Sequence, residues 1–271
     1  MHGLGNDFVI VDGREEAVAM TPALAQAIAD RRTGVGCDQL IVLAPSAVAD
    51  VLMESWNADG SMAEVCGNAS RCVVKLTGAT TIETVGAILV GSAEGDEIEV
   101  SLGEPRFEWD AIPLAYAMNS APVPLAWDEL AEPMAINVGN PHLVFFVEAI
   151  DEARLAELGP RIEHDAAFPE RINVNVASVA DGVVTLRTWE RGAGLTLACG
   201  TGACATAVAA IVQKRAISPV RVKMKGGALS IAWAPGEQVS MRGAATHVFQ
   251  GEIDLEAFEA NSSNNFVGAF E

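Results

Sequence analysis

The two halves of the chain repeat one arrangement of residues. Nine residues separate Trp56 from Cys66, and nine separate Trp189 from Cys199, with the second pair 133 positions after the first. Each cysteine is followed by a glycine. Three further pairs of similar segments occur in the same order at offsets of 133 to 141 positions: 5–11 with 139–147, 51–57 with 184–190, and 86–90 with 227–231. This order and spacing predict an ancient duplication that produced two domains of one fold.

Short strands bounded by Gly, Asn and Asp make up most of each half, and one helix is predicted to begin at each Cys-Gly pair. The helix that follows Cys199 is apolar all round, so we expect it to be buried on every side. The predicted class is α+β, an α/β two-domain protein with pseudo-symmetric halves. Each domain is expected to be a curved, mostly antiparallel sheet wrapped around a central helix, with the active site in the cleft between the domains.

The domain boundaries follow from the same repeat. We expect a first domain over residues 1–112, completed by about residues 245–256, a second over 113–244, and a polar C-terminal extension over 257–271. The segment Ala111 to Trp127, which three prolines interrupt, is interpreted as a linker. Two smaller helices are predicted, one from Thr21-Pro22 to Arg32 and one from Asp151 to Leu158 that Gly159-Pro160 ends.

Composition excludes several classes of function. The formal charge is −19, so little on the surface would neutralise phosphates, and neither nucleic acid nor an anionic membrane is an expected partner. There is no signal-peptide pattern, and no uncharged apolar segment of about 18 residues that would predict a membrane span. Five cysteines do not form a disulfide framework in a chain of 271 residues, and a cytoplasmic location is expected.

A cysteine at a helix start has a chemical use. The first turn of a helix carries unpaired N–H groups and a partial positive charge, which favour a thiolate and lower the pKa of the thiol. Two such helix ends would offer N–H donors to one carboxylate and place a thiol on either side of the adjacent carbon. A thiolate that removes an α-proton and a thiol that returns one to the opposite face would invert an amino acid centre. This scheme requires no cofactor and no metal.

The remaining cysteines are interpreted as structural. Cys72 and Cys204 lie in apolar runs and are expected in the core, and Cys37 is also assigned a structural role. The spacings between Cys66 and Cys72 and between Cys199 and Cys204 do not suit a zinc site. No CxxC redox pair is present.

Seven segments together resemble the diaminopimelate epimerase family, over Met1 to about Leu255: MHGLGNDFVIVDG, GVGCDQL, WNADGSMAEVCGN, GNPH, ERIN, WERGAGLTLACGTGACA and ATHVFQGEI. The resemblance implies a cofactor-independent isomerase that uses two thiols to interconvert LL- and meso-diaminopimelate, on the route to lysine and peptidoglycan. It also implies two pseudo-symmetric domains, each with a sheet around a central helix, and commonly a homodimer. Phe249, in the last segment, is then a candidate interface residue.

The resemblance implies roles for particular residues. Cys66 would take the proton from the LL isomer and Cys199 from the meso isomer. Glu190 would suit an ammonium group, Arg191 would grip the distal carboxylate with its guanidinium fork, and both His142 and Glu190 would tune the pKa of a thiol. An alternative for His142 is a hydrogen-bonded histidine of the core. The implied substrate-binding residues are Asn6, Gln39, Asn57, Gly67, Asn68, Asn140, Asn173, Glu190, Arg191, Gly200 and Thr201.

Three positions depart from the usual family pattern. Ala69 replaces a glycine after Cys-Gly-Asn, Met62 replaces an acidic residue after Asp-Gly-Ser, and Asn175 replaces a glutamate. Ala69 should be tolerated if it lies inside a helix. None of the three is an expected catalytic position, and they bear on the fit of the distal end of the substrate.

Two other functions remain open at this point. The first is a proline or hydroxyproline racemase of the same superfamily, although such relatives tend to carry histidine where Asn68 stands. The second is a thiol redox or binding protein in which Cys66 and Cys199 form a reversible disulfide. Turnover of diaminopimelate distinguishes both from an epimerase.

Overall fold

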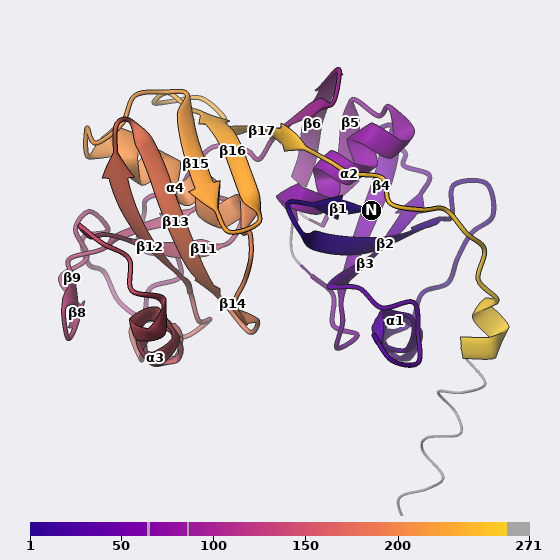
Figure 1. Cartoon of the computed structure of the whole chain (residues 1–271), viewed down its shortest axis with the longest axis horizontal. Helices are drawn as coiled ribbons and strands as arrows, with labels where there is room; N and C mark the ends of the chain where they lie inside the picture. Colours follow the sequence, from indigo (N-terminus) through magenta and orange to yellow (C-terminus); the bar gives the residue numbers. More distant parts are fainter. Residues whose placement is uncertain (64–65, 86, 259–271) are drawn as a thin grey trace, which may run out of the picture. The chain divides into compact units, whose positions relative to one another are not determined.

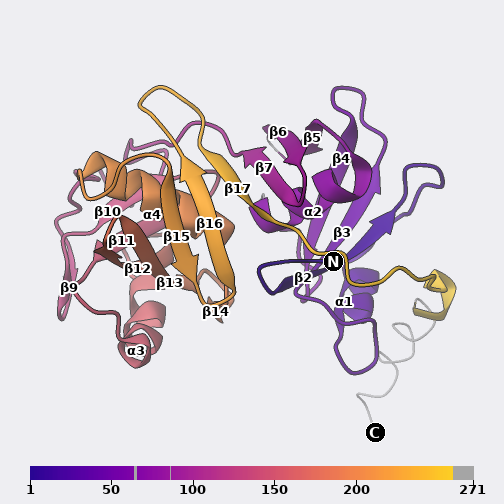
Figure 2. The same cartoon turned by 45° about the horizontal axis from the view of Figure 1, so that its top comes forward.

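The computed structural model describes residues 1–63, 66–85 and 87–258. The chain forms two compact units, the first from Met1–Ile98 together with the chain from Ala244 onward, and the second from Glu99–Gly243. The chain passes from one unit to the other within β7 (Glu97–Ser101) and returns within β17 (Ser240–Ala244). Figure 1 and Figure 2 together label the elements of each unit.

The first unit is a mixed sheet in which two helices connect strands. Its strands follow the order β1 (His2–Gly3), β2 (Asn6–Asp12), β3 (Gln39–Ala44), β4 (Val51–Asn57), β5 (Thr81–Thr84), β6 (Ala87–Glu94) and β7. Helix α1 (Pro22–Ala29) connects β2 to β3, and α2 (Gly67–Thr77) connects β4 to β5. These two connections join parallel neighbours, whereas β1–β2, β3–β4 and β5–β6 are antiparallel. Parallel neighbours need such crossovers, which explains where the helices lie.

The second unit follows the same plan. Its sheet runs β10 (Met134–Asn137), β11 (Pro141–Phe146), β12 (Asn173–Ala180), β13 (Val183–Glu190), β15 (Val220–Met224), β16 (Gly227–Ala232) and β17. Helix α3 (Glu152–Glu163) joins the parallel pair β11 and β12, and α4 (Gly200–Val212) joins the parallel pair β13 and β15. Two small additions are the hairpin of β8 (Ala126–Trp127) and β9 (Leu130–Ala131), and β14 (Gly194–Leu195) beside β13. The antiparallel pairing of Trp189 with Leu195 in β14 matches the single antiparallel bridge of Trp56 with Met62 in the first unit.

Strand pairing confirms the duplication residue by residue. Phe8 lies opposite Gln39 in the first parallel pair, and His142 lies opposite Asn173 in the second, 134 positions later in both strands. The order of strands, their directions and the places of both helices therefore agree between the units. The predicted α+β class with two related halves is confirmed.

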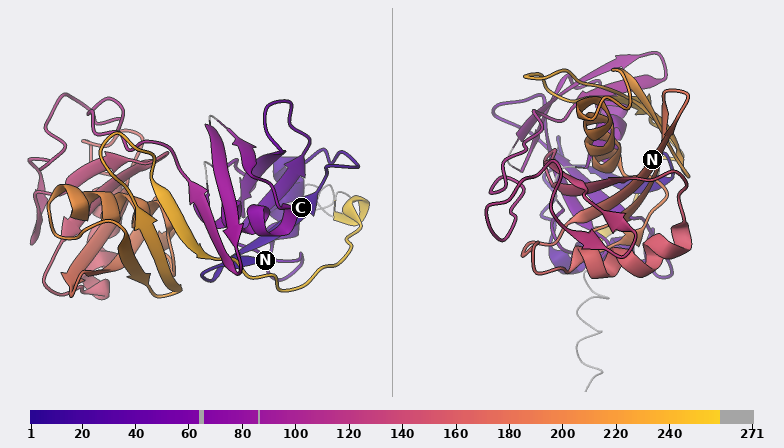
Figure 3. Two further views of the ribbon diagram at one scale, coloured as in Figure 1. Left: turned by 90° about the horizontal axis from the view of Figure 1, so that it is seen from above. Right: turned by 90° about the vertical axis from the view of Figure 1, so that its left-hand side faces the viewer.

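Each unit wraps its sheet around one buried helix, as predicted. Every residue of α4 from Gly200 to Ala210 is buried, and in α2 the buried part runs from Gly67 to Val74. Figure 2 shows α4 behind β15 and β16, which it contacts, and the right-hand view of Figure 3 shows α4 nearly end-on with strands around it. Small residues such as Ala and Gly let the sheet approach this helix closely.

The predicted linker at 111–127 is wrong. Ile112, Leu114 and Val123 are buried in the core cluster of the second unit, where they pack with residues of β11 and α3. The indole of Trp127 lies edge-on to Phe145 and donates a hydrogen bond of 2.9 Å to Asp165. Prolines rule out helix and inner strand in this segment, but they do not prevent its apolar side chains from being buried. The unit boundary accordingly lies at Ile98–Glu99, earlier than the predicted boundary after residue 112.

Helix α1 is shorter than predicted. Thr21 caps its start by accepting a hydrogen bond from Leu24 N, as its sequence suggests, but the helix ends at Ala29 instead of Arg32. Asp30 causes the early end, because its carboxylate accepts hydrogen bonds from the backbone N–H groups of Arg32 and Thr33 and so stabilises a turn.

Helix α3 is longer than predicted, since it continues through Gly159 and Pro160 to Glu163. The ring of Trp189 covers Gly159, and the buried carboxylate of Glu163 accepts a hydrogen bond of 2.8 Å from the Trp189 indole. These contacts with β13 hold the last turn in helical form although Pro160 cannot donate to the preceding turn. Of the segments with predicted features, Glu64 and Val65 just before Cys66, Gly86, and most of the C-terminal extension lie outside the described residues.

Candidate active site

Cys66 is the N-terminal cap of α2, as predicted. Its backbone is extended, and its carbonyl oxygen accepts hydrogen bonds from the amide and hydroxyl of Ser70. Its thiol is partly exposed, and Sγ lies 3.9 Å from Oδ1 of Asn6. The same oxygen accepts a hydrogen bond of 3.3 Å from Nδ2 of Asn68. Asn6 and Asn68, both predicted site residues, therefore lie next to Cys66. Gly67, also predicted, is the first residue of α2.

A buried arginine that the sequence analysis missed holds this arrangement. Arg71 is fully buried on α2, and its guanidinium donates 2.8 Å to Oδ1 of Asn68 and 3.4 Å to the carbonyl of Gly67. Because Arg71 occupies Oδ1 of Asn68, the amide nitrogen of Asn68 must face Asn6. The Cys-Gly-Asn motif predicts the helix start but carries no sign that the next turn holds a buried cation.

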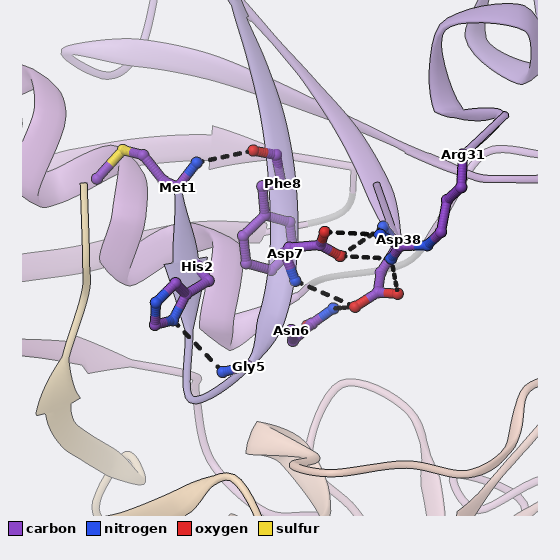
Figure 4. A network of polar contacts seen from close by, with 8 residues as sticks. All are labelled: Met1, His2, Gly5, Asn6, Asp7, Phe8, Arg31 and Asp38. Atoms are coloured by element: carbon purple, nitrogen blue, oxygen red, sulfur yellow. Dashed lines mark hydrogen bonds and ion pairs between the residues drawn. The ribbon is translucent and has the colours of Figure 1, made fainter. Parts of the chain in front are cut away.

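Asn6 is fixed from its other side by an ionic cluster, which Figure 4 shows. Nδ2 of Asn6 donates 3.0 Å to the carboxylate of Asp38. The Arg31 guanidinium contacts both Asp38 and Asp7, and it holds the pKa of Asp7 at about 2 by hydrogen bonding, against the opposing effect of burial. Asn6 therefore presents its carbonyl oxygen, an acceptor, toward Cys66.

Gln39 and Asn57 form a pair across β3 and β4. Nε2 of Gln39 donates 3.0 Å to Oδ1 of Asn57, whose own Nδ2 donates 3.1 Å to the Ser61 hydroxyl. Oε1 of Gln39 is buried and has no hydrogen-bond partner among the described residues. An unsatisfied buried acceptor is costly in a folded protein, and a ligand that donates hydrogen bonds would satisfy it.

Cys199 is the N-terminal cap of α4 and is more enclosed than Cys66. It is 4% exposed, and its sulfur accepts a hydrogen bond of 3.3 Å from the amide of Gly202 and lies 3.6 Å from the hydroxyl of Thr201. Burial and the negative charge of Glu190 raise the pKa of Cys199 well above its ordinary value, against the lowering effect of Thr201 and Gly202. The expectation that a helix start lowers this pKa is wrong for Cys199, because burial and a carboxylate outweigh the helix end.

Glu190 is the last residue of β13, and Arg191 follows it. Glu190 accepts a hydrogen bond from the hydroxyl of Thr196, and the Arg191 guanidinium donates 3.0 Å to the carbonyl of Glu170. The buried amide of Asn173 accepts from Arg191 N at 3.0 Å and donates 2.9 Å to the carbonyl of Pro141. Asn173, predicted to bind substrate, thus holds the backbone that carries Arg191.

A second residue that the sequence analysis missed supports this turn. The buried carboxylate of Glu163 accepts hydrogen bonds from the Trp189 indole at 2.8 Å and from the amide of Gly192 at 2.9 Å. It therefore anchors the chain on both sides of Glu190 and Arg191. No spacing in the sequence connects Glu163 to this turn, since the contact depends on α3 continuing past Pro160.

His142 is fully buried on β11, next to Asn140 at the start of that strand. Its Nε2 lies 2.8 Å from Oδ1 of Asn140, and its Nδ1 lies 3.1 Å from Nδ2 of Asn175. Burial, together with the positive charge of Arg191, lowers the pKa of His142 to about 3. The ring is neutral near pH 7.

No three His, Cys, Asp or Glu side chains of the described residues are grouped so that they could hold a metal ion. In the same part of the chain, no helix is both long enough and apolar enough to cross a membrane.

A family model described as diaminopimelate epimerase matches residues 1–107 and 134–248. The chain belongs to the diaminopimelate epimerase family. It is 62% identical to the diaminopimelate epimerase of Rhizorhabdus wittichii, with 97% of each chain covered, and 58% identical to that of Sphingopyxis alaskensis, with 95% of this chain and 97% of the relative covered. The resemblance drawn from the motifs is confirmed, and this epimerase family member is an isomerase.

Solved structures with low sequence identity share the fold. A phenazine biosynthesis protein of the PhzF family from Bacillus anthracis matches with a TM-score of 0.61 and 17% identity, over 90% of this chain and 92% of that one. A predicted epimerase from Pseudomonas aeruginosa matches with a TM-score of 0.55 and 17% identity, over 89% and 90%. The fold of the epimerase family member is therefore also found in proteins whose sequences have diverged widely.

Proposed function

We propose that this protein interconverts LL- and meso-diaminopimelate by acid/base catalysis with Cys66 and Cys199, without a cofactor. One observation carries the proposal: in a member of the diaminopimelate epimerase family, the two cysteines cap equivalent helices of two duplicated units. The proposal requires both helix ends to approach one substrate, with a thiol on either side of the α-carbon.

The surroundings of the two thiols suit different starting states. Burial and Glu190 favour the protonated form of Cys199, which makes Cys199 the acid of the resting enzyme. Cys66 would then be the base and would take the α-proton of the LL isomer, while Cys199 gives its proton to the opposite face. In the reverse direction Cys199 takes the proton of the meso isomer.

The reacting carboxylate is assigned to the two helix starts. The backbone N–H groups there, with Gly67 and Asn68 in one unit and Gly200 and Thr201 in the other, would bind its oxygens and stabilise the charge that develops when the proton leaves. Loss of one such donor typically raises a barrier by about 3–4 kcal/mol.

The distal end of the substrate has its own partners in the proposal. Oε1 of Gln39, which lacks a partner among the described residues, suits an ammonium group. Glu190, whose negative charge raises the pKa of Cys199, suits an ammonium group near that thiol. Arg191 is assigned to the distal carboxylate. Asn6, Asn57 and Asn140 are further substrate-binding residues, whereas Asn173 acts through the backbone of Arg191.

Proton exchange tests the function. Reduced protein incubated with LL-diaminopimelate in D2O should place deuterium at the α-position and produce the meso isomer, as followed by NMR and chiral chromatography. Free proline and hydroxyproline should be left unchanged. Exchange into proline with none into diaminopimelate would overturn the substrate assignment.

Single replacements test the two thiols. Cys66→Ser and Cys199→Ser should each lower the epimerisation rate about 10²- to 10⁴-fold, the usual contribution of a general acid or base. Cys204→Ala, in the same helix as Cys199 and equally buried, is the matched control and should stay within a few-fold of the original rate. Full activity in either serine variant would exclude a two-thiol mechanism.

We also propose a homodimer in the cytoplasm. Five cysteines without a disulfide pattern and a charge of −19 suit that compartment. Phe249 and the neighbouring Val248 are large apolar side chains with 67% and 59% of their surface exposed, which makes them candidates for the subunit contact.

A further inference from the structure

The hydrogen bonds around His142 determine which of its nitrogens carries the proton. Nδ2 of Asn175 lies 3.1 Å from Nδ1 of His142 and also 3.0 Å from the carbonyl oxygen of Leu143. A carbonyl oxygen can only accept, so the amide nitrogen of Asn175 must be on that side. The Thr188 hydroxyl donates 3.0 Å to Oδ1 of Asn175, which agrees with this orientation.

The tautomer follows from these contacts. Nδ2 of Asn175 has only protons to offer, so Nδ1 of His142 must accept a hydrogen bond and cannot carry a proton. The neutral ring then has its proton on Nε2, which donates 2.8 Å to Oδ1 of Asn140. The ring is fully buried, so a charged imidazole is disfavoured as well.

Asn140 is the exposed end of this chain of contacts. Its carbonyl oxygen is occupied by His142, and its Nδ2 forms no hydrogen bond with the described residues, although the side chain is partly accessible. Asn140 therefore presents a donor. Its counterpart Asn6 presents an acceptor, because Asp38 binds its nitrogen.

The first unit has no equivalent network. Phe8 occupies the strand position of His142, and Ile41 occupies that of Asn175. The second unit makes space for its network through Gly202, where a Cβ atom would lie 2.6 Å from Oδ1 of Asn175. The same Gly202 donates its amide to Cys199, so the network lies directly behind the turn that holds this thiol.

We propose that Asn175 and His142 are positioning residues that turn the amide of Asn140, so that its Nδ2 donates to an oxygen of the substrate. His142 thus acts through its fixed proton on Nε2 and does not exchange protons with a thiol. The proposal rests on the proposed function only in assigning the ligand of Asn140.

Nitrogen NMR tests the tautomer without substrate. In ¹⁵N-histidine-labelled protein, two-bond ¹H–¹⁵N spectra should show His142 protonated on Nε2 from pH 5 to pH 9, with no titration. The half-exposed His164 serves as an internal reference signal from a solvent-accessible ring. In Asn175→Asp the carboxylate should draw a proton to Nδ1. A wild-type ring protonated on Nδ1, or one that titrates between pH 5 and 8, would overturn the proposal.

Kinetics of two replacements test the role. His142→Phe removes the donor to Asn140 and should raise KM for diaminopimelate about tenfold or more, with a smaller change in kcat. His142→Gln keeps an N–H donor near the Nε2 position and cannot take part in proton transfer at neutral pH. It should recover most of the loss seen in His142→Phe.

Equal loss in His142→Gln and His142→Phe would show that the ring itself is needed and would overturn the proposal. Thermal unfolding of each variant checks that it is folded. If the wild-type protein does not epimerise diaminopimelate, the proposed function fails while the tautomer measured by NMR still stands or falls by itself.

Discussion

At the scale of single residues, burial decides the chemistry of the cysteines. Burial raises the pKa of Cys37 to about 11 and that of Cys72 to about 12, and it raises the pKa of Cys199 together with Glu190. Sequence reasoning assigned Cys72 to the core and gave Cys37 a structural role, and both side chains are buried. It did not predict the protonated state of Cys199, because the approach of Glu190 to that thiol depends on the folded second unit.

The buried thiols predict a loss of stability at alkaline pH. An unfolded thiol loses its proton near pH 9, whereas Cys72 keeps its proton to about pH 12 in the folded chain. Between these values the folded state holds more protons, so the free energy of unfolding falls by about 1.4 kcal/mol per pH unit for this thiol. Cys72→Ala should remove this contribution, as measured by urea denaturation from pH 8.5 to 11.

The matched control is Val73→Ala, at a buried neighbouring position of α2 that carries no titrating group. It should lower stability at every pH without changing the slope. Equal slopes in wild type and Cys72→Ala would mean that Cys72 ionises at similar pH in the folded and unfolded states.

At the scale of elements, one contact sets the length of α3. A Cβ atom at Gly159 would lie 2.5 Å from the ring of Trp189, so only glycine lets the helix and β13 approach this closely.

Ala69 in α2 and Gly202 in α4 occupy equivalent positions of the two duplicated helices. Gly202 lies against Asn175, where a Cβ atom would be too close. In the first unit the strand position of Asn175 holds Ile41 instead, and Ala69 is helical and fully buried.

Gly159→Ala is therefore expected to destabilise the protein although alanine favours helices. Overpacking against Trp189 should cost about 1–3 kcal/mol, more than the gain in helix propensity of about 1 kcal/mol. Urea denaturation measures the difference, with Gly251→Ala as the control because the nearest atom there lies 3.9 Å away. If Gly159→Ala proves as stable as Gly251→Ala, Trp189 moves aside at little cost.

At the scale of the whole molecule, the exposed Phe249 predicts the oligomeric state. Phe249→Glu would place a carboxylate in the proposed subunit contact and should convert dimers to monomers in sedimentation velocity experiments. Ile217→Glu is the matched control, since Ile217 is also apolar and 89% exposed but lies in the second unit. Wild-type protein that sediments as a monomer, or a Phe249→Glu variant that remains dimeric, would refute this interface.

Several features followed from the sequence by itself: the duplication, the helix starts at Cys66 and Cys199, the buried helix after Cys199, and the family. They depend on residue types and on their spacing along the chain. Local propensities and the hydrophobic pattern determine strands, helix caps and buried faces from these. Most proposed site residues lie on the same short motifs, which is why they could be named before the fold was known.

Only the tertiary structure decided that residues 111–127 join a core, that α3 runs past Pro160, and that His142 is neutral. It also revealed Arg71, Glu163 and Asn175 as the residues that hold the two Cys-Gly turns and their neighbours. Each of these outcomes depends on burial or on a hydrogen-bond partner far away in the chain, and such partners meet only when the sheet has closed around its helix.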